Sequence, residues 1–163
     1  MKRYHLLFIF TAAAVIVLDQ ASKFIISGLL ENNGVVTVIE GFLNLVHVRN
    51  RGMAFGLMNR PDPGIAPYLL MAVTIIAVVL ILIWSFRLRL EDRRLLFGLS
   101  LILGGAVGNL IDRIRLREVI DFLDVYIGAY HWPAFNVADS AITVGTCWIA
   151  VCILFLNKKE NTL

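Results

Sequence analysis

The chain has 163 residues, of which 59% are hydrophobic and only 17% are charged, and its mean hydropathy is +0.80. Soluble domains carry about 25% charged residues, so this composition excludes an ordinary soluble protein and indicates an integral membrane protein. The net charge of +3 is small, and the basic residues gather at the ends of apolar segments. This distribution suits anionic lipid headgroups and argues against nucleic acid as a partner.

Four segments are long and apolar enough to cross a bilayer, whose core of about 30 Å takes about 20 helical residues. They cover Leu6–Leu30, Pro67–Phe86, Leu95–Ile114 and Asn136–Leu156. The first begins like a signal peptide, but Asp19-Gln20-Ala21-Ser22-Lys23 offers no convincing small-residue cleavage site, so we expect a retained span. The sequence therefore predicts an all-α membrane protein, a four-helix transmembrane bundle, as one domain over residues 1–163.

Near the end of the first span, Asp19 is followed by Lys23 at the i+4 position, which favours a salt bridge on one helix face. One interpretation is a pair that marks the membrane boundary, with the lysine reaching toward water. The other is that the pair forms the wall of a polar site. The residues themselves leave both interpretations open.

Residues 31–66 are too polar to span and too apolar for a free linker. Val35–Ile39 and Leu43–Val48 are β-branched, partly alternating runs that predict short strands, and Val119–Val125 is a candidate for another. We expect a small β-sheet insert on the outer membrane surface, above the bundle. The Asn50-Arg51-Gly52 sequence predicts a turn, at which Arg49, Arg51 and the Asn50 amide contact either a polar ligand or lipid headgroups.

The orientation follows from the stretch 87–94, which contains four arginines. Lys2, Arg3, Lys158 and Lys159 fall on the same side if all four segments cross. The positive-inside rule then places both termini and this loop in the cytoplasm. Nine of the twelve carboxylates fall on the other side, so the basic residues there are available as partners in a polar site.

Small residues form a stripe along the third span, at Ser100, Gly104, Gly105 and Gly108. Such a stripe favours close packing between helices. It leads to Asn109, Asp112 and Arg113, which share about one helical turn at the membrane edge. These three form either an interfacial cap or a hydrogen-bonded scaffold for nearby acidic groups.

Two aspartates, Asp121 and Asp139, lie at the edges of apolar segments, where an ionised carboxylate is costly and is a functional candidate. Asp139 has a structural alternative, because Asn136 is placed to N-cap the fourth helix with Asp139 in its first turn. Asp121 has no such alternative, although a strand at the water surface would solvate it. Two carboxylates held together do not both ionise easily, which provides the acid and base of an aspartic peptidase.

Other chemistries have weaker support. His5, His47 and His131 are scattered, and the sequence has no HExxH, CxxC or EF-hand spacing, so we expect no metal and no cofactor. Cys147 and Cys152 share one apolar segment but fall on different helix faces, so we expect two small buried hydrophobic residues and no disulfide between them.

The polar motifs follow one another along the whole chain: Asp19-Gln20-x-x-Lys23, Asn50-x-Gly52-x-Ala54-Phe55, Gly108-Asn109-x-x-Asp112-Arg113, Val119-Ile120-Asp121-Phe122 and Phe135-Asn136-x-Ala138-Asp139. With these motifs on four spans, the chain resembles the bacterial prolipoprotein signal peptidases, the type II signal peptidases. The resemblance implies an intramembrane aspartyl endopeptidase that needs no metal or cofactor. It also implies cleavage on the amino side of a diacylglyceryl-modified cysteine, in the bacterial cytoplasmic membrane, at an active site near the outer face.

By the same resemblance, Asp121 and Asp139 would be the catalytic pair. The residues that would bind substrate or support the pair are Asp19, Lys23, Asn50, Gly52, Gly105, Gly108, Asn109, Asp112, Arg113, Val119, Phe135, Asn136 and Ala138. Met53 is larger than we expect at a variable position and would alter the shape of the groove. The implied partners are diacylglyceryl-modified prolipoproteins and membrane lipids, and we expect a monomer.

Two other classes of function remain open from the residues alone. A small proton-coupled transporter also needs intramembrane carboxylates, although it is expected to show internal repeats or broken helices. A noncatalytic lipid-binding protein would use the same polar rim and would tolerate exchange of either aspartate for asparagine.

Overall fold

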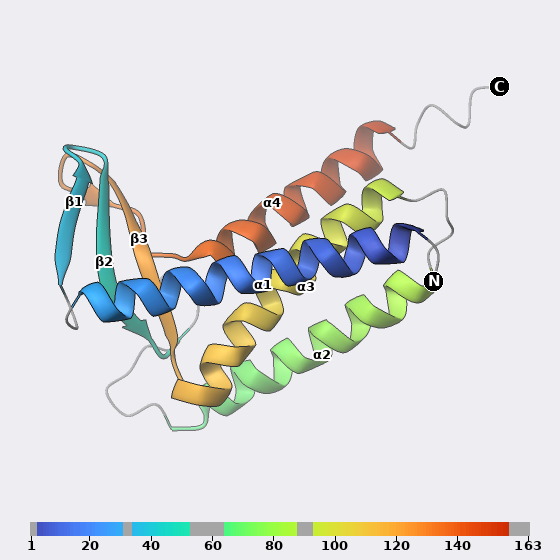
Figure 1. The fold of residues 1–163 in the computed structure, drawn as a ribbon, viewed down its shortest axis with the longest axis horizontal. Coiled ribbons are helices and arrows are strands. Elements are labelled where there is room, and N and C mark those ends of the chain that lie inside the picture. The colour runs from blue at the N-terminus through green and yellow to red at the C-terminus, as the bar shows by residue number, and fades with distance from the viewer. Residues whose placement is uncertain (1–2, 31–33, 53–63, 88–92, 157–163) are drawn as a thin grey trace.

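The computed structural model describes residues 3–30, 34–52, 64–87 and 93–156. Helices run the length of the molecule, and a small sheet lies at one end of them (Figure 1). The elements, in chain order, are α1 (Arg3–Leu29), β1 (Val35–Ile39), β2 (Leu43–Asn50), α2 (Ala66–Arg87), α3 (Arg93–Leu116), β3 (Val119–Ile127), β4 (Tyr130–His131), α4 (Val137–Val151) and the π-helical turn η2 (Cys152–Leu156). The predicted combination of a helix bundle and a small sheet is confirmed.

Within the described residues, four helices are long and apolar enough to cross a membrane. Their spanning portions are His5–Leu29, Pro67–Ser85, Arg93–Leu116 and Val137–Phe155, which agree with the predicted spans to within a few residues. Large apolar side chains point outward from them, such as Phe24, which is 82% exposed, and Leu154. Such side chains are stable against lipid and would form a large unfavourable surface in water.

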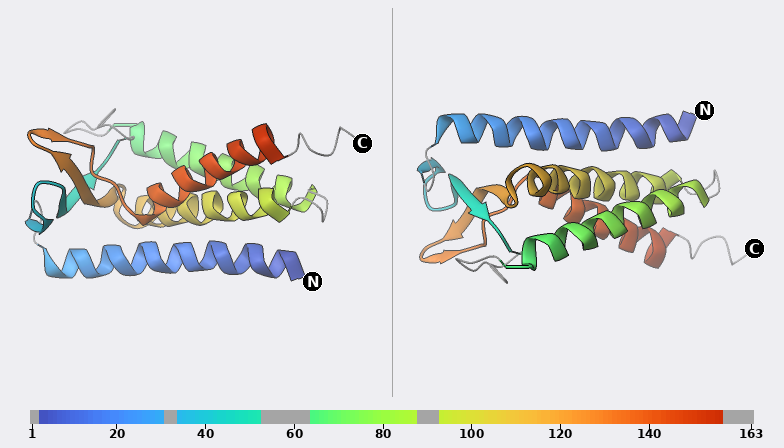
Figure 2. Two further views of the ribbon diagram at one scale, coloured as in Figure 1. Left: turned by 90° about the horizontal axis from the view of Figure 1, so that it is seen from above. Right: turned by 90° about the horizontal axis from the view of Figure 1, so that it is seen from below.

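The central helix is α3, which contacts the other three helices. Figure 2 shows α1 on one side of α3, and α2 and α4 on the other. A Cβ atom on Gly104 would lie 2.8 Å from the carbonyl oxygen of Ala12 in α1, and a Cβ atom on Gly98 would lie 3.1 Å from that of Gly145 in α4. The small residues therefore allow close helix packing, as the sequence predicts.

The sheet has the strand order β1-β2-β3-β4, and all neighbouring pairs are antiparallel. It is not confined to the predicted insert, because β3 and β4 come from the chain after α3. The β2 strand is longer than predicted because its ladder with β3 continues through Arg49 opposite Ile120 to Asn50 opposite Val119. The β3 strand is longer at its other end, where Tyr126 and Ile127 pair with β4. Because β3 follows α3 directly and contacts it, the pairing of β2 with β3 places β2 beside β3 at the C-terminal end of α3.

The two ends of the bundle differ. In Figure 1, α1 begins and α4 finishes at the end opposite the sheet, where α2 also ends and α3 begins. Arg87, Arg93 and Arg94 belong to that end. The four membrane-length helices make this a multi-pass membrane protein.

The prediction that both cysteines are buried is wrong for one of them. Cys152 is buried, but Cys147 is exposed. The face of α4 that packs on α3 contains Ala138 and Gly145, which are both buried. Two residues beyond Gly145, the helix has turned by about 200°, so Cys147 points away from α3. In a spanning helix this outward face meets lipid.

Candidate active site

Asp121 and Asp139 reach one pocket from two different elements, β3 and the first turn of α4. The pocket has a volume of about 570 Å³. Its other lining residues are Asn50, Gly52, Asn109, Arg113, Val119, Trp132, Pro133, Ala134, Phe135, Ser140, Ile142, Thr143 and Val144. A mainly apolar pocket with two convergent acids is a typical arrangement for an enzyme site.

Asn136 determines where α4 begins, and it also contacts Asp121. Its side-chain oxygen accepts a hydrogen bond from the N–H of Asp139 at 2.9 Å, which is the N-cap that the sequence predicts. Its amide nitrogen donates to Asp121 Oδ1 at 2.8 Å. One fully buried side chain therefore caps the helix that carries Asp139 and orients the other aspartate. Capping and a catalytic role for Asp139 are compatible, because the cap is part of the site.

Asn50 holds the second oxygen of Asp121. Its side-chain oxygen accepts from the N–H of Gly52 at 2.9 Å, in the turn that follows β2. With that oxygen occupied, the amide nitrogen faces Asp121 and donates to Oδ2 at 3.0 Å. The turn predicted at this place is therefore the element that aims the amide donor.

Asn109 in α3 presents a donor to Asp139, and Lys23 in α1 determines that orientation. The ammonium group of Lys23 lies 3.0 Å from Asn109 Oδ1. Because an ammonium group only donates, this contact requires the oxygen of the amide to face Lys23. The nitrogen then faces Asp139 and donates to Oδ1 at 2.8 Å.

Three amides thus supply donors to three of the four carboxylate oxygens of the pair. The carboxyl group of Asp139 also accepts a hydrogen bond from the backbone of Asn136. Each aspartate is therefore held by two donors, which fix the orientation of the two carboxyl groups before any substrate binds.

Burial raises the pKa of Asp121 from its ordinary value of 3.8 to about 7. The hydrogen bonds from Asn50 and Asn136 and the charge of Lys23 lower this pKa, while the negative charge of Asp139 raises it further. The side chain is 2% exposed, so the sequence-based alternative of a solvated strand aspartate is excluded. Near neutral pH, Asp121 therefore exchanges a proton readily, as a general acid or base must.

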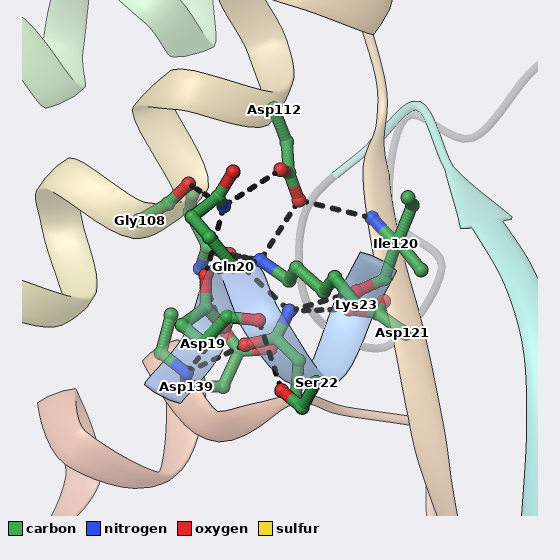
Figure 3. A network of polar contacts seen from close by, with 12 residues as sticks. Asp19, Gln20, Ser22, Lys23, Gly108, Asp112, Ile120, Asp121 and Asp139 are labelled. Carbon is green, nitrogen blue, oxygen red and sulfur yellow. Dashed lines mark hydrogen bonds and ion pairs between the residues drawn. The ribbon is translucent and has the colours of Figure 1, made fainter. Parts of the chain in front are cut away.

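A buried ion cluster lies behind the pair. Lys23 Nζ lies 2.8 Å from Asp19 Oδ2 and 2.8 Å from Asp112 Oδ2, and all three side chains are at most 3% exposed (Figure 3). Lys23 does not reach toward water, so the interpretation as a boundary pair is wrong. The interpretation as a site wall agrees with the geometry, because Lys23 also contacts Asn109.

The two acids of this cluster hold the backbone next to the pocket aspartates. Asp19 Oδ1 accepts from the N–H of Ala138 at 2.9 Å, one residue before Asp139. Asp112 Oδ2 accepts from the N–H of Ile120 at 3.3 Å, one residue before Asp121. A carboxylate that accepts from backbone N–H groups is a rigid anchor inside a protein. The cluster therefore fixes the two backbones that position the pair.

Gln20 has a role that sequence reasoning did not assign, although the residue stands inside one of the motifs. Its amide nitrogen donates to Asp19 Oδ2 at 3.2 Å, to Gly108 O at 3.2 Å and to Asp112 Oδ1 at 3.0 Å (Figure 3). It therefore joins the two acids. At Asp19 it shares Oδ2 with Lys23, and at Asp112 it binds the oxygen that Lys23 does not contact. Its position next to Asp19, at the polar end of an apolar span, is the signal that points to it.

The remaining predicted site residues have two kinds of surroundings. Arg113 lines the pocket, and its positive charge acts on both Asp139 and Asp121. Gly52, Val119 and Phe135 also line the pocket. Ala138, Gly105 and Gly108 lie behind it, where α3 and α4 touch: a Cβ atom on Gly105 would collide with Ala138 O, and one on Gly108 would lie 2.6 Å from Asp19 Oδ2.

The two arginines at the predicted turn, Arg49 just before it and Arg51 within it, have a protein partner. Arg49 and Arg51 lie 2.7 Å and 3.2 Å from the two oxygens of Glu118. These ion pairs join the end of β2 to the chain between α3 and β3. The prediction about Met53 falls outside the described residues.

A bundle of membrane-length helices that encloses two aspartates in one pocket defines a multi-pass membrane hydrolase of the aspartic type. The comparisons with known proteins identify the family. The family model described as "Signal peptidase (SPase) II" matches residues 11–155. The chain therefore belongs to the signal peptidase II family, and it is a peptidase.

Relatives and solved structures agree with this assignment. A lipoprotein signal peptidase of Syntrophus aciditrophicus is 43% identical over 161 residues, which are 99% of this chain and 100% of that protein. One of Desulforapulum autotrophicum is 46% identical over 148 residues, 90% of each chain. A solved bacterial membrane enzyme, determined by the in meso method at 2.3 Å, has a TM-score of 0.82 and 31% identity, and the match covers 96% of this chain and 91% of that chain.

Proposed function

We propose that Asp121 and Asp139 are the catalytic pair with which this signal peptidase removes the signal peptide from prolipoproteins, on the amino side of the lipidated cysteine. One observation carries the proposal: the two carboxylates share a pocket in which three amides are locked to face them. Such preorganised donors fix the geometry of the pair before substrate binds.

The reaction needs one proton on the pair. One carboxylate takes a proton from water while the water oxygen attacks the scissile carbonyl carbon. The other carboxyl group, which is protonated, donates a hydrogen bond to the developing oxyanion. A proton then passes to the amide nitrogen as the C–N bond breaks, which releases a new carboxylate on the signal peptide and a free amino group on the cysteine. The proton belongs to the coupled pair and not to either carboxyl group alone.

The supporting residues have four roles in this proposal. Asn50, Asn109 and Asn136 orient the two carboxylates, and Arg113 adds positive charge where negative charge develops. Gly52, Val119 and Phe135 form walls that place the peptide. The others hold the elements together behind the pocket: Asp19, Lys23, Gly105, Gly108, Asp112 and Ala138.

The test of the pair is exchange of each aspartate for asparagine, which preserves volume and removes the titrating group. Asp121→Asn and Asp139→Asn should each abolish cleavage of a synthetic lipidated prolipoprotein peptide by the purified protein in detergent. The double variant should be little worse than either single one, because residues that act as a unit are strongly non-additive. Glu40→Gln, which removes an exposed carboxylate in the β1–β2 turn, is the matched control. Normal cleavage by Asp139→Asn would show that Asp139 has only a structural role, in the first turn of α4.

We further propose that the diacylglyceryl group of the substrate admits it to the pocket. The pocket contains Ile142 and Val144 of α4, and Val144 is also exposed on the outer face of that helix, where lipid chains lie. Burial of each CH₂ group contributes about 0.8 kcal/mol, so two acyl chains would hold the cysteine at the membrane surface. Cleavage of one peptide with cysteine, glyceryl-cysteine or diacylglyceryl-cysteine should be compared in the same micelles. Equal kcat/KM for all three would exclude this role of the lipid.

The proposed location is the bacterial cytoplasmic membrane, with both termini inside and the sheet, the 31–66 insert and the pocket near the outer face. The arginines at the end opposite the sheet support this orientation. Single cysteines at Thr37 and at Leu90, in a chain without Cys147 and Cys152, should be labelled in intact cells by a membrane-impermeant maleimide. Labelling is expected at position 37 alone, and labelling at position 90 would reverse the orientation.

We also propose that residues 1–163 act as one domain and as a monomer. The described residues of a single chain supply both aspartates and all three amide donors. The purified protein in detergent should therefore have the mass of one chain at concentrations at which it cleaves substrate. A loss of activity on dilution, together with dissociation of a dimer, would contradict the monomer.

A further inference from the structure

A second pair of polar side chains, Asp124 and His131, lies on the sheet outside the catalytic network. His131 Nδ1 lies 2.9 Å from Asp124 Oδ1 and 3.0 Å from Oδ2. Asp124 is largely buried, whereas the side chain of His131 is 51% exposed. Both nearby atoms are carboxylate oxygens, so Nδ1 carries the hydrogen of this contact.

Both partners are held by neighbouring strands. Asn44 stands opposite Asp124 in the β2–β3 ladder and donates from Nδ2 to Asp124 Oδ2 at 2.9 Å. The ring of His131 stacks on that of Tyr126, with centroids 4.9 Å apart and an angle of 8° between the planes. The hydroxyl oxygen of Tyr126 in turn accepts from the N–H of Gly41 at 2.9 Å. The position of His131 is therefore fixed by contacts with β3 in two directions.

The β4 strand that carries His131 is short. The β4 strand has two residues, and its pairing with β3 is limited to Tyr126 with His131 and Ile127 with Tyr130. Both β4 residues are exposed. A two-stranded contact of this length is marginal in water. The side-chain pair therefore adds a contact that the backbone ladder lacks.

The chain that follows His131 forms one wall of the pocket. Trp132, Pro133, Ala134 and Phe135 all line it. The N–H of Trp132 donates to Val125 O at 2.8 Å, and Phe135 exchanges hydrogen bonds with Leu123 at 2.8 and 3.0 Å. Pro133, between these two residues, has no N–H to donate. Residues Trp132–Phe135, here called the arch, are therefore hydrogen-bonded to β3 at both ends, next to Asp124 at one end and next to Asn136 at the other.

We propose that Asp124 and His131 are positioning residues that fix this arch and thereby the wall against which the substrate peptide binds. This inference rests on the proposed function, since it assigns a role within the same pocket. Neither residue lines the pocket, so the pair acts through Trp132–Phe135. Its loss should weaken substrate binding, while the catalytic network from Asn50, Asn109 and Asn136 remains in place.

Two variants of one residue separate the hydrogen bond from the stacking contact. His131→Phe retains a ring that can stack on Tyr126 but has no donor for Asp124. His131→Asn retains a donor near the place of Nδ1 but has no ring. We expect His131→Phe to raise KM about tenfold, as the loss of a hydrogen bond to a charged group does, with kcat within about twofold. His131→Asn should restore most of the loss, and Tyr130→Ala, which truncates an exposed neighbouring side chain, should behave like the wild type.

A second measurement does not depend on activity. In a chain with Trp84→Phe and Trp148→Phe, Trp132 is the single tryptophan and reports on the wall. Its emission should shift and acrylamide should quench it more strongly after His131→Phe, and much less so after His131→Asn. Wild-type KM and unchanged Trp132 fluorescence in His131→Phe would overturn the proposal, as would a fall in kcat at constant KM. If Asp121→Asn still cleaved substrate, the proposed function would fail, and the fluorescence would still decide whether His131 holds the wall.

Discussion

Replacing Gly105 by alanine should displace Asp139 and remove most of the peptidase activity. A Cβ atom at this position would overlap Ala138 O and would lie 2.8 Å from Ile142 Cγ1. Both atoms belong to the first turns of α4, and Ala138 directly precedes Asp139. The carbonyl is backbone, so it cannot rotate away as a flexible side chain would. The first turn of α4 must therefore retreat from α3 by about 1 Å to reach ordinary contact distance.

The magnitude follows from two separate effects. Overpacking of a filled interface costs about 1–3 kcal/mol of stability. A displacement of about 1 Å at a reacting group costs about 100-fold in rate, and here it lengthens the hydrogen bond from Asn109 to Asp139, which is 2.8 Å in the native structure. We therefore expect a melting temperature lowered by several degrees and a much larger proportional loss of cleavage.

Two glycines of the same chain serve as controls. Gly104→Ala overpacks α3 against α1, where its Cβ atom would lie 2.8 Å from Ala12 O, so it should cost similar stability and far less activity. Gly28→Ala has open space around its Cβ atom, and a helical alanine should stabilise by about 0.5–1 kcal/mol. Initial rates on a lipidated peptide and thermal melting in detergent would be measured for all three. Equal activity of Gly105→Ala and Gly104→Ala would refute the argument.

Three further predictions concern the polar network. Lys23→Met should destabilise the fold by about 3–5 kcal/mol, since it leaves two buried carboxylates without their cation, and a melting temperature equal to that of the wild type would contradict this. Asn109→Ala should slow cleavage without abolishing it, because the residue orients Asp139 and transfers no proton; full activity at an unchanged melting temperature would favour a mere capping role. The raised pKa of Asp121 means that folding favours its neutral form, so its contribution to stability is lost as the pH rises from about 4 to about 7. Between these pH values the melting temperature of the wild type should fall relative to that of Asp121→Asn. If the melting temperatures of the two proteins changed in parallel with pH, the raised pKa of Asp121 would be excluded.

Some features of this protein are determined by the sequence itself. Four apolar runs of sufficient length define the spans, because a bilayer requires each crossing segment to satisfy its own backbone hydrogen bonds and to present apolar side chains. Asp121 and Asp139 stand out for the same reason, since a carboxylate beside an apolar segment is costly unless it has a partner or a function. The N-cap at Asn136 and the Asp19–Lys23 pair are also local, because each depends on residues three or four positions apart.

Other features depend on contacts between distant segments. Lys23 reaches Asp112 and Asn109 from another helix, and nothing in the spacing along the chain specifies those partners. The same holds for the amide of Asn50, which meets Asp121 only because β2 pairs with β3. Cys147 is a case in which the local sequence misleads. Its apolar neighbours in the sequence predict burial, but the residue lies on the face of α4 that α3 does not cover and is exposed.

One physical reason explains why some features follow from the sequence and others only from the tertiary structure. Hydropathy and capping are properties of a segment in its solvent, so they can be read from neighbouring residues. The orientation of a buried amide is decided by which of its two ends meets a group that can only donate or only accept. That group, such as the ammonium of Lys23 beside Asn109, is brought there by the packing of α1 against α3. The spans and the candidate acids therefore follow from the sequence, while the arrangement that turns two costly carboxylates into a pair is decided by the tertiary structure.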